Sequence, residues 1–331
     1  MHTLLERLPA EEKRKLVLTP EPPWEDPMLA TLTHHHFSDP EWVYGRKLDG
    51  VRCLTYRKGD ELRLMSRTRN EMSASFPELR DYFGTLPPGD YVLDGEVVAI
   101  RDGETDFQML QPRMGLIDPA DARKTGVPIF YYVFDILYFE GYDVTPLWLT
   151  SRKSILAQAL PYRDPLRYLE DRGGDGLAYF REACKLGWEG LIAKRAKSPY
   201  QHRRSEDWLK FKCVEDQEMV IGGWTEPKGK RIEFGALLLG YYKDGRLMYA
   251  GKVGTGFNEQ VLVELMSKLK PLARDTSPFA GPVPEREVHW VEPRLVAEIG
   301  FENWTTEGRL RQPRYRGLRY DKNAKDVVRE G

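Results

Sequence analysis

Apolar residues in roughly the first 210 positions recur at spacings typical of both strands and helices. Residues 42–66 contain three extended segments, WVYGRKL, VRCLTYR and ELRLMS, and Lys58-Gly59-Asp60 provides a turn between the last two. Further strands are predicted at 91–100, 129–139, 191–195 and 208–212, and helices at 151–160 and 176–186. This mixture predicts an α+β domain.

The pattern changes after Cys213. Three strand candidates, 218–224, 236–242 and 246–253, precede a helix candidate at 258–272 and a strand at 294–301. Three strands, a helix and further strand follow the order of a five-stranded OB barrel, a fold that commonly binds nucleic acid. With 331 residues the chain is longer than one hydrophobic core usually organises. We therefore predict two domains, 1–214 and 215–331.

Composition and charge narrow the class of protein. Hydrophobic residues make up 41% and charged residues 31% of the chain, which favours a soluble globular protein. The net charge of -1 argues against a surface that is basic throughout. Residues 309–322 form a local basic segment with interleaved tyrosines, which suits a polyanion or, equally, a solvated surface. No segment resembles a signal peptide or a membrane helix, so we expect a cytoplasmic location and no membrane partner.

Cysteines and histidines give no sign of a disulfide or a metal centre. The chain has three cysteines, Cys53, Cys184 and Cys213, without CxxC spacing, so neither a disulfide framework nor a zinc ribbon is expected and a reducing compartment fits. The run His34-His35-His36 would point alternately to opposite sides of an extended chain, which disfavours a shared metal ion.

Two segments place lysines where covalent chemistry could occur. The segment KLDGVR at 47–52 sets a lysine, a carboxylate and an arginine around a glycine. A lysine with its ordinary pKa near ~10.4 needs neighbouring cations or burial to become a nucleophile at neutral pH. In WLKFK, strand alternation puts Lys210 and Lys212 on one face and directs Leu209 and Phe211 to the core.

A third segment carries paired carboxylates. In LDGEVV at 93–98, the same alternation places Asp94 and Glu96 on one face, where ribose hydroxyls or a divalent cation would satisfy them. Taken singly, each of these segments also fits an ordinary solvated strand or turn. Their order along the chain distinguishes the two interpretations.

Seven motifs occur in the order found in the covalent nucleotidyltransferases, and the chain resembles an ATP-dependent DNA ligase over about residues 25 to 325. The motifs are KLDGVR, SRTRN at 66–70, LDGEVV, VFDILYFEG at 133–141, EGLIAKR at 189–195, WLKFK and the basic RYDK that ends at Lys322. The segment 222–257 is similar to the ligase domain of bacterial end-joining ligases and their stand-alone relatives.

This resemblance implies a nucleotidyltransferase (adenylation) domain followed by an OB-fold domain. It implies an enzyme that seals 5′-phosphate/3′-hydroxyl nicks through a covalent lysyl-AMP and a DNA-adenylate, in DNA repair or end joining. The implied cofactors are ATP and Mg²⁺, with Mn²⁺ as a substitute. The implied partners are nicked duplex DNA and, by analogy, a Ku-like end binder or a primase-polymerase, with the ligase itself a monomer.

The resemblance also assigns residues around the nucleophile. Lys47 would attack the α-phosphate of ATP and carry AMP, and Lys210 and Lys212 would contact that phosphate. Glu189 and Asp49 would surround the catalytic magnesium, and Glu96 would bind the ribose and share the metal.

Further residues would bind the nucleotide and the nick. Arg52 would contact the ribose or the 3′ end of the nick, Arg67 the 5′-phosphate, and the ring of Phe134 the adenine. The motif made by Arg319, Asp321 and Lys322 would orient the pyrophosphate of ATP when the OB domain closes.

One position departs from the family pattern. Relatives usually carry glutamate two residues before the lysine, whereas this chain has Gly45. Neither Tyr44 nor Arg46 replaces the carboxylate, although a backbone carbonyl could accept the hydrogen bond from the adenine amino group. Slower adenylation or looser nucleotide choice is the expected consequence.

Two other functions compete with DNA sealing. An mRNA-capping guanylyltransferase or an RNA ligase shares the Lys-x-Asp-Gly lysine and much of the fold. A catalytically silent scaffold could bind nucleic acid through the OB barrel alone, but the joint presence of Lys47, Glu96, Glu189, Lys210 and Lys212 disfavours it.

Overall fold

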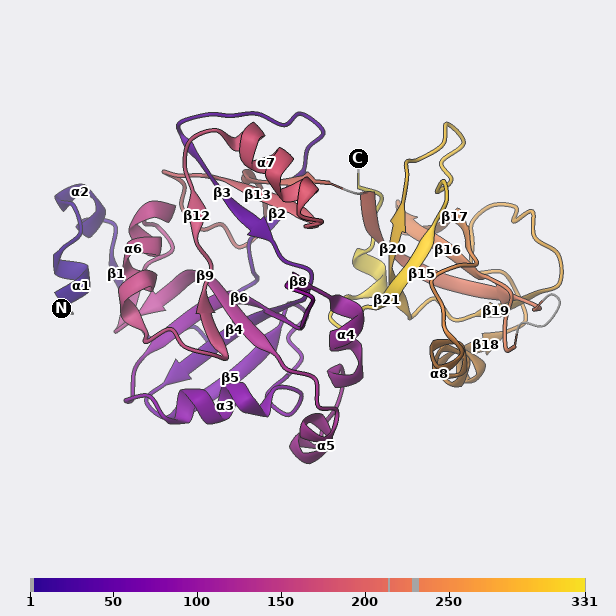
Figure 1. Cartoon of the computed structure of the whole chain (residues 1–331), viewed down its shortest axis with the longest axis horizontal. Coiled ribbons are helices and arrows are strands. Elements are labelled where there is room, and N and C mark those ends of the chain that lie inside the picture. Colours follow the sequence, from indigo (N-terminus) through magenta and orange to yellow (C-terminus); the bar gives the residue numbers. More distant parts are fainter. Residues whose placement is uncertain (1–2, 214, 228–231, 331) are drawn as a thin grey trace. The chain divides into compact units, whose positions relative to one another are not determined.

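The structure is a computed structural model that describes residues 3–213, 215–227 and 232–330 (Figure 1). The chain separates into two compact units, Met1–Cys213 and Val214–Gly331, and each is described by itself. Within the described ranges, no helix is long and apolar enough to cross a membrane.

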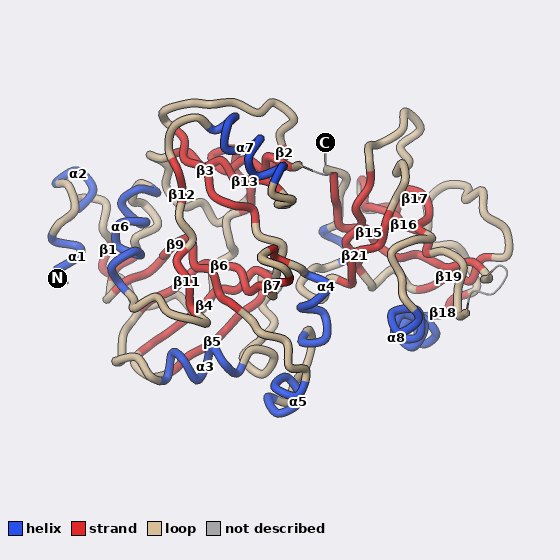
Figure 2. The backbone as a smooth tube through the Cα atoms, viewed as in Figure 1, coloured by secondary structure: helices blue, strands red, loops and turns tan. Residues whose placement is uncertain are grey.

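The first unit is built on two larger sheets and a short hairpin (Figure 2). The first sheet has the order β1-β10-β9-β6-β4-β5, with β11 paired to β9. Its strands are β1 (Val17–Leu18), β4 (Val51–Lys58), β5 (Glu61–Ser66), β6 (Tyr91–Val98), β9 (Phe130–Phe139), β10 (Tyr142–Asp143) and β11 (Leu166–Tyr168).

The second sheet has the order β12-β3-β13-β14-β2. Its strands are β2 (Leu29–Leu32), β3 (Trp42–Lys47), β12 (Asp171–Arg172), β13 (Gly190–Arg195) and β14 (Arg204–Lys212). The hairpin consists of β7 (Ile100–Arg101) and β8 (Glu104–Thr105). Both predicted groups of strands, around 42–66 and around 191–212, are thus present.

Two helices cover the sheets. Helix α6 (Leu149–Ala159) packs against β9, and α7 (Gly176–Lys185) packs against β3 and β13. Helix α7 begins after Asp175, whose side chain accepts a hydrogen bond from the Ala178 amide at 3.0 Å. The remaining helices of this unit are α1 (Thr3–Glu6), α2 (Ala10–Lys13), α3 (Pro77–Gly84), α4 (Phe107–Leu110), η1 (Gln111–Arg113) and α5 (Pro119–Lys124).

Strand β9 contributes to two hydrophobic clusters of the first unit. Tyr131 and Val133 belong to the larger cluster, whereas Phe134 and Leu137 belong to a second cluster that also contains Trp208 of β14. The first sheet is therefore buried on both faces, and one of these faces packs against the second sheet. This explains why 129–139 reads as a continuous apolar run rather than an alternating strand.

The second unit contains a sheet of seven strands in the order β17-β16-β15-β19-β18, with β20 paired to β15 and β21 to β20. Its strands are β15 (Glu215–Thr225), β16 (Leu237–Lys243), β17 (Arg246–Val253), β18 (Ala273–Arg274), β19 (Val288–Val291), β20 (Val296–Phe301) and β21 (Arg314–Leu318). The helices are α8 (Glu259–Leu269), η2 (Lys270–Leu272) and η3 (Ala324–Asp326). Apolar residues of α8, including Leu262 and Leu265, complete the core.

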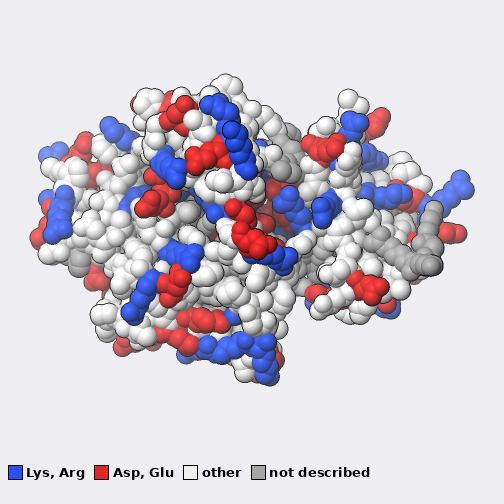
Figure 3. Space-filling view, in the orientation of Figure 1, with Lys and Arg blue, Asp and Glu red and all other residues white. Residues whose placement is uncertain are grey.

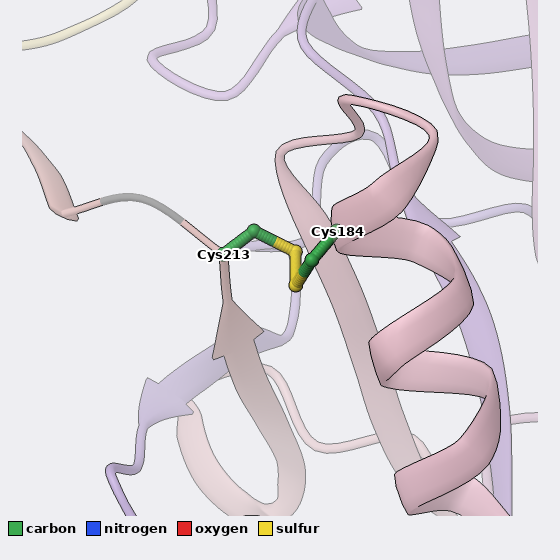
Figure 4. Close-up of a disulfide and its surroundings, with 2 residues drawn as sticks. All are labelled: Cys184 and Cys213. Atoms are coloured by element: carbon green, nitrogen blue, oxygen red, sulfur yellow. A yellow bond between two sulfur atoms is a disulfide. The ribbon is translucent and has the colours of Figure 1, made fainter.

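A disulfide joins Cys184 near the end of α7 to Cys213 directly after β14 (Figure 4). The expectation that the chain forms no disulfide is therefore wrong. The two cysteines are 29 residues apart in sequence, and their Cα atoms lie 5.3 Å apart. The fold brings them together because the Cys213 amide donates to the carbonyl of Glu189, which follows α7 closely. The spacing of the cysteines in the sequence does not indicate that Cys184 and Cys213 lie close together.

Candidate active site

Three adjacent strands bring the predicted lysines onto one face of the second sheet. In the central strand β13, Gly190 lies opposite Lys47 of β3 on one side and opposite Lys212 of β14 on the other. One step along, Ile192 lies opposite Gly45 and Lys210 in the same way. Residues directly opposite each other project to the same face of a sheet. The prediction that Lys210 and Lys212 share a face is confirmed, and Lys47 lies on that face too.

Glu189 pairs with the predicted nucleophile. Its Oε1 forms an ion pair with Lys47 Nζ, and the two side chains are only 7% and 19% exposed. Glu189 directly precedes Gly190, where φ is +148° and an added Cβ would lie 1.9 Å from the carbonyl oxygen of Phe211. Only glycine permits this approach of β13 to β14. The glycine thereby sets the start of β13, and with it the position of the Glu189 carboxylate.

An aromatic wall lies on the same face of the second sheet as these lysines, because Trp208 precedes Lys210 by two residues on β14. The ring of Phe134 packs edge-on against Trp208, with centroids 6.1 Å apart. The Arg52 guanidinium lies 4.6 Å from the Phe134 ring centroid. Phe134 and Arg52 come from the first sheet and Trp208 from the second, so both sheets contribute to the wall.

Asp94 positions Arg52. Its two carboxylate oxygens accept from Nε and Nη2 of Arg52, each at 2.5 Å, and one of them also accepts from the Tyr200 hydroxyl at 2.6 Å. Asp94 is fully buried. The expectation that ribose or a cation satisfies Asp94 together with Glu96 is therefore wrong for Asp94. Burial opposes the charge of Arg52, but Asp94 outweighs it and raises the pKa of the guanidinium further above its ordinary range.

The predicted metal ligands come from three different segments of the first unit. Asp49 lies between β3 and β4, Glu96 lies on β6 opposite Arg52, and Glu189 pairs with Lys47. Across the described positions, no three His, Cys, Asp or Glu side chains are placed to hold an ion together. Mg²⁺ usually binds through one or two carboxylates, waters and phosphate oxygens. The residues present thus fit a magnesium ion that phosphates help to hold.

Arg67 lies in the turn that follows β5 and is half-buried. This turn belongs to the first sheet, as does β4 with Arg52. The role of Arg67 at the 5′-phosphate stays a prediction.

Arg319 and Asp321 form a buried ion pair in the second unit. Arg319 Nη2 lies 2.9 Å from Asp321 Oδ2, and its Nη1 lies 3.5 Å from Glu298 Oε2. Burial alone would raise the pKa of Asp321, but Arg319 outweighs it and lowers that pKa. Lys322 Nζ lies 2.5 Å from Glu218 Oε1. Part of the basic segment is therefore neutralised within its own unit, and Figure 3 shows acidic and basic side chains intermixed on the visible surface.

A second charged group beside the aromatic wall was not predicted from the sequence. Lys194 of β13 lies 5.3 Å from the Phe134 centroid and 5.2 Å from that of Trp208. It pairs with Asp171 of β12, which also pairs with Lys153 of α6. Strand alternation from Gly190 through Ile192 predicts that Lys194 lies on the same face of the second sheet as Lys47 and Lys212. Nothing local could have placed Asp171, because β12 has only two residues.

Comparison with known proteins identifies the family. Residues 27–212 match the family model described as the ATP dependent DNA ligase domain, and residues 230–322 match the ATP dependent DNA ligase C terminal region. The chain belongs to the ATP-dependent DNA ligases. The predicted fold, a nucleotidyltransferase domain followed by an OB-fold domain, is confirmed.

Individual relatives agree with this assignment. The multifunctional non-homologous end joining protein LigD of Pseudomonas aeruginosa is 40% identical over 97% of this ligase chain, which covers 38% of that protein. LigD of Mycobacterium tuberculosis is also 40% identical, over 92% of the chain, which covers 40% of that protein. The chain thus spans about two fifths of these LigD proteins. A Bacillus subtilis prophage-derived ligase-like protein, LigB, is 30% identical and is covered over 98% of its length.

A solved structure supports the fold. The mycobacterial DNA ligase D complexed with ATP and MES aligns with a TM-score of 0.67 at 37% identity, over 92% of this chain and 98% of that one. The predicted resemblance to the end-joining ligases is thereby confirmed at the level of sequence and fold.

Proposed function

We propose that this chain is an ATP-dependent DNA ligase that seals 5′-phosphate/3′-hydroxyl nicks through a lysyl-AMP on Lys47 and a DNA-adenylate. The observation that carries the proposal is the row of Lys47, Gly190 and Lys212 across three strands, with Glu189 paired to Lys47. A lysine among cations on a half-buried face is the arrangement that covalent phosphoryl transfer needs.

In the first step, Lys47 Nζ forms a bond to the α-phosphorus of ATP. The bond from that phosphorus to the bridging oxygen breaks, and its electron pair leaves with pyrophosphate. The amine must give up a proton, and the paired Glu189 carboxylate is placed to accept it. Lys210 and Lys212 would stabilise the negative charge on the phosphoryl oxygens.

In the following steps, AMP passes to the 5′-phosphate of the nick, and the 3′-hydroxyl displaces it to close the strand. Arg52 lies beside the aromatic wall and would contact the ribose or the 3′ end. Arg67 would bind the 5′-phosphate. Phe134 would stack on the adenine, because its ring forms part of that wall.

A divalent cation, Mg²⁺ or in its place Mn²⁺, would be held by phosphate oxygens together with one or two of the carboxylates of Glu189, Glu96 and Asp49. Such a cation supplies charge neutralisation at the phosphates when bound. Asp321 and Arg319, with the neighbouring Lys322, would orient the leaving pyrophosphate from the second unit.

The similarity to LigD supports a role in end joining. In that role the ligase would act as a cytoplasmic monomer, and its partners would be nicked duplex DNA and a Ku-like end binder or a primase-polymerase. The chain's partial coverage of LigD leaves these partners as proposals.

Sealing of defined nicks tests this function. The full chain is incubated with Mg²⁺ and a nicked duplex that carries a labelled 5′-phosphate, in parallel with ATP and with GTP, and with a DNA or an RNA nicked strand. We expect sealing of DNA with ATP. Labelling of the protein by GTP alone would indicate a guanylyltransferase, sealing of RNA alone an RNA ligase, and DNA binding without either product a scaffold.

A further inference from the structure

The carboxylate of Asp171 fills the space beside Gly45, the position where the family resemblance leads us to expect glutamate. Asp171 is the direct partner of Gly45 in the β12-β3 ladder, so the two residues share a face. A Cβ added to Gly45 would lie 2.3 Å from Asp171 Oδ1. A side chain at position 45 and this placement of Asp171 therefore exclude each other.

Asp171 is ionised and buried on the face that carries Lys47. Its side chain is 5% exposed, and Lys194 Nζ lies 3.1 Å from Oδ1 and 3.3 Å from Oδ2. Lys153 Nζ lies 3.4 Å from Oδ2. Burial alone would raise the pKa of Asp171, but the two lysines outweigh it and lower that pKa. The group is therefore a hydrogen-bond acceptor at neutral pH.

Lys194 connects this carboxylate to the aromatic wall. The same ammonium group that bonds Asp171 lies 5.3 Å from the Phe134 ring centroid. A planar base stacked on Phe134 would thus present one edge to an acceptor, Asp171, beside a donor, Lys194. A carboxylate has about four lone-pair directions, and the three contacts with lysine leave about one for a ligand.

We propose that Asp171 is the residue that reads the 6-amino group of adenine, in place of a side chain at position 45, while Lys194 donates to the adjacent ring nitrogen. This inference rests on the proposed function. Adenine offers an amino donor next to a ring acceptor, which matches this pair. Guanine has an acceptor oxygen at position 6, which the carboxylate would repel.

The test is equilibrium binding of two nucleotides to the full chain with Lys47→Ala, which cannot be adenylated. The probes are ATP and purine riboside triphosphate, which lacks only the 6-amino group. Loss of a hydrogen bond to a charged group predicts a preference for ATP of roughly 10- to 100-fold. We expect Asp171→Ala to abolish this preference, so that the ratio of the two affinities falls to about one. The neighbouring Glu170→Ala, on an exposed position, is the matched control and should keep it.

A ratio of two affinities separates recognition from misfolding, because a partly unfolded variant would lose both nucleotides equally. Retention of the ATP preference by a folded Asp171→Ala protein would overturn the inference. Failure of the unmodified chain to become adenylated would instead overturn the proposed function, which keeps the two failures distinct.

A second pair of variants uses the exclusion between positions 45 and 171. Gly45→Glu alone should bind ATP at least about tenfold more weakly, because its side chain collides with Asp171 and adds a second negative charge. Gly45→Glu combined with Asp171→Ala should recover both affinity and ATP preference. Equal behaviour of the single and double variants would contradict the exchange of one carboxylate for the other.

Discussion

Lys47 of β3 and Lys212 of β14 lie opposite the same residue, Gly190 of β13, from its two sides. Strands in a sheet are about 4.8 Å apart, so the two Cα atoms are separated by about 10 Å. The backbone ladder therefore sets the distance between the proposed nucleophile and the proposed phosphate-binding cation. A phosphoryl group can lie between the two side chains without any rearrangement of the sheet.

This relationship predicts a strong effect of Lys212→Ala on the first chemical step. Removing one preorganised group that stabilises phosphoryl charge should lower the rate of self-adenylation about 10²- to 10³-fold. Single-turnover labelling with ATP measures the rate. Lys185→Ala, an exposed lysine at the end of α7, should leave the rate unchanged. Similar rates for both variants would remove Lys212 from the phosphate site.

Gly190→Ala should both destabilise the first unit and impair adenylation. The added Cβ would collide with the Phe211 carbonyl, and the left-handed φ adds a cost of order 1–3 kcal/mol in the free energy of unfolding. Denaturant titration measures that free energy. Gly84→Ala is the matched control, because its Cβ would meet no atom within 4 Å. Comparable stability of the two variants would show that the close approach of β13 to β14 is not needed.

The sequence was sufficient to predict the strands that carry the lysines and their shared face. Strand alternation alone places Lys210 with Lys212, and the ordered motifs brought Lys47, Glu189 and Phe134 into one domain. Long-range pairs could not be read in this way. The alternating pattern predicts Asp94 as a carboxylate available to a ligand, whereas the fold pairs it with Arg52. Asp171 lies on a strand of two residues, which is too short to show a periodic pattern. Such partners are fixed by the packing of distant segments, which local spacing does not encode.

Lys153 predicts a specific dependence of stability on pH. The pKa of Lys153 is lowered from its ordinary value of 10.5 to about 8. Burial is the main cause; attraction by Asp171 opposes the shift, and repulsion from Lys194 adds to it. Between these two values the unfolded chain holds a proton that the native protein lacks. The free energy of unfolding of the parent should therefore rise with pH relative to Lys153→Met, by up to about 3 kcal/mol.

Denaturant titrations of the parent and of Lys153→Met check this pH dependence. They run between pH 7.5 and 10.5, roughly the range spanned by the native and unfolded pKa values of Lys153. The same titrations of Lys58→Met, a substitution at an exposed end of β4, serve as the control. A constant difference for Lys153→Met would mean that the buried ammonium does not titrate there.

The disulfide between Cys184 and Cys213 should stabilise the first unit. Closing a loop of 29 residues restricts the unfolded chain and contributes about 3 to 4 kcal/mol to the free energy of unfolding. Addition of dithiothreitol should remove this contribution from the parent and leave Cys184→Ser unaffected. Thiol titration of the unfolded, unreduced parent should detect one cysteine, the buried Cys53. Detection of three thiols would show that the bond does not form.

The covalent role of Lys47 is tested most directly by the intact mass of the full chain after incubation with ATP and Mg²⁺, followed by peptide mapping. We expect a gain of one adenylyl group, located on Lys47 and released when pyrophosphate is added. Lys47→Ala should gain nothing, while Lys58→Ala should be adenylated like the parent. An adenylyl group on any other residue, or nick sealing by Lys47→Ala at the parent's rate, would contradict it.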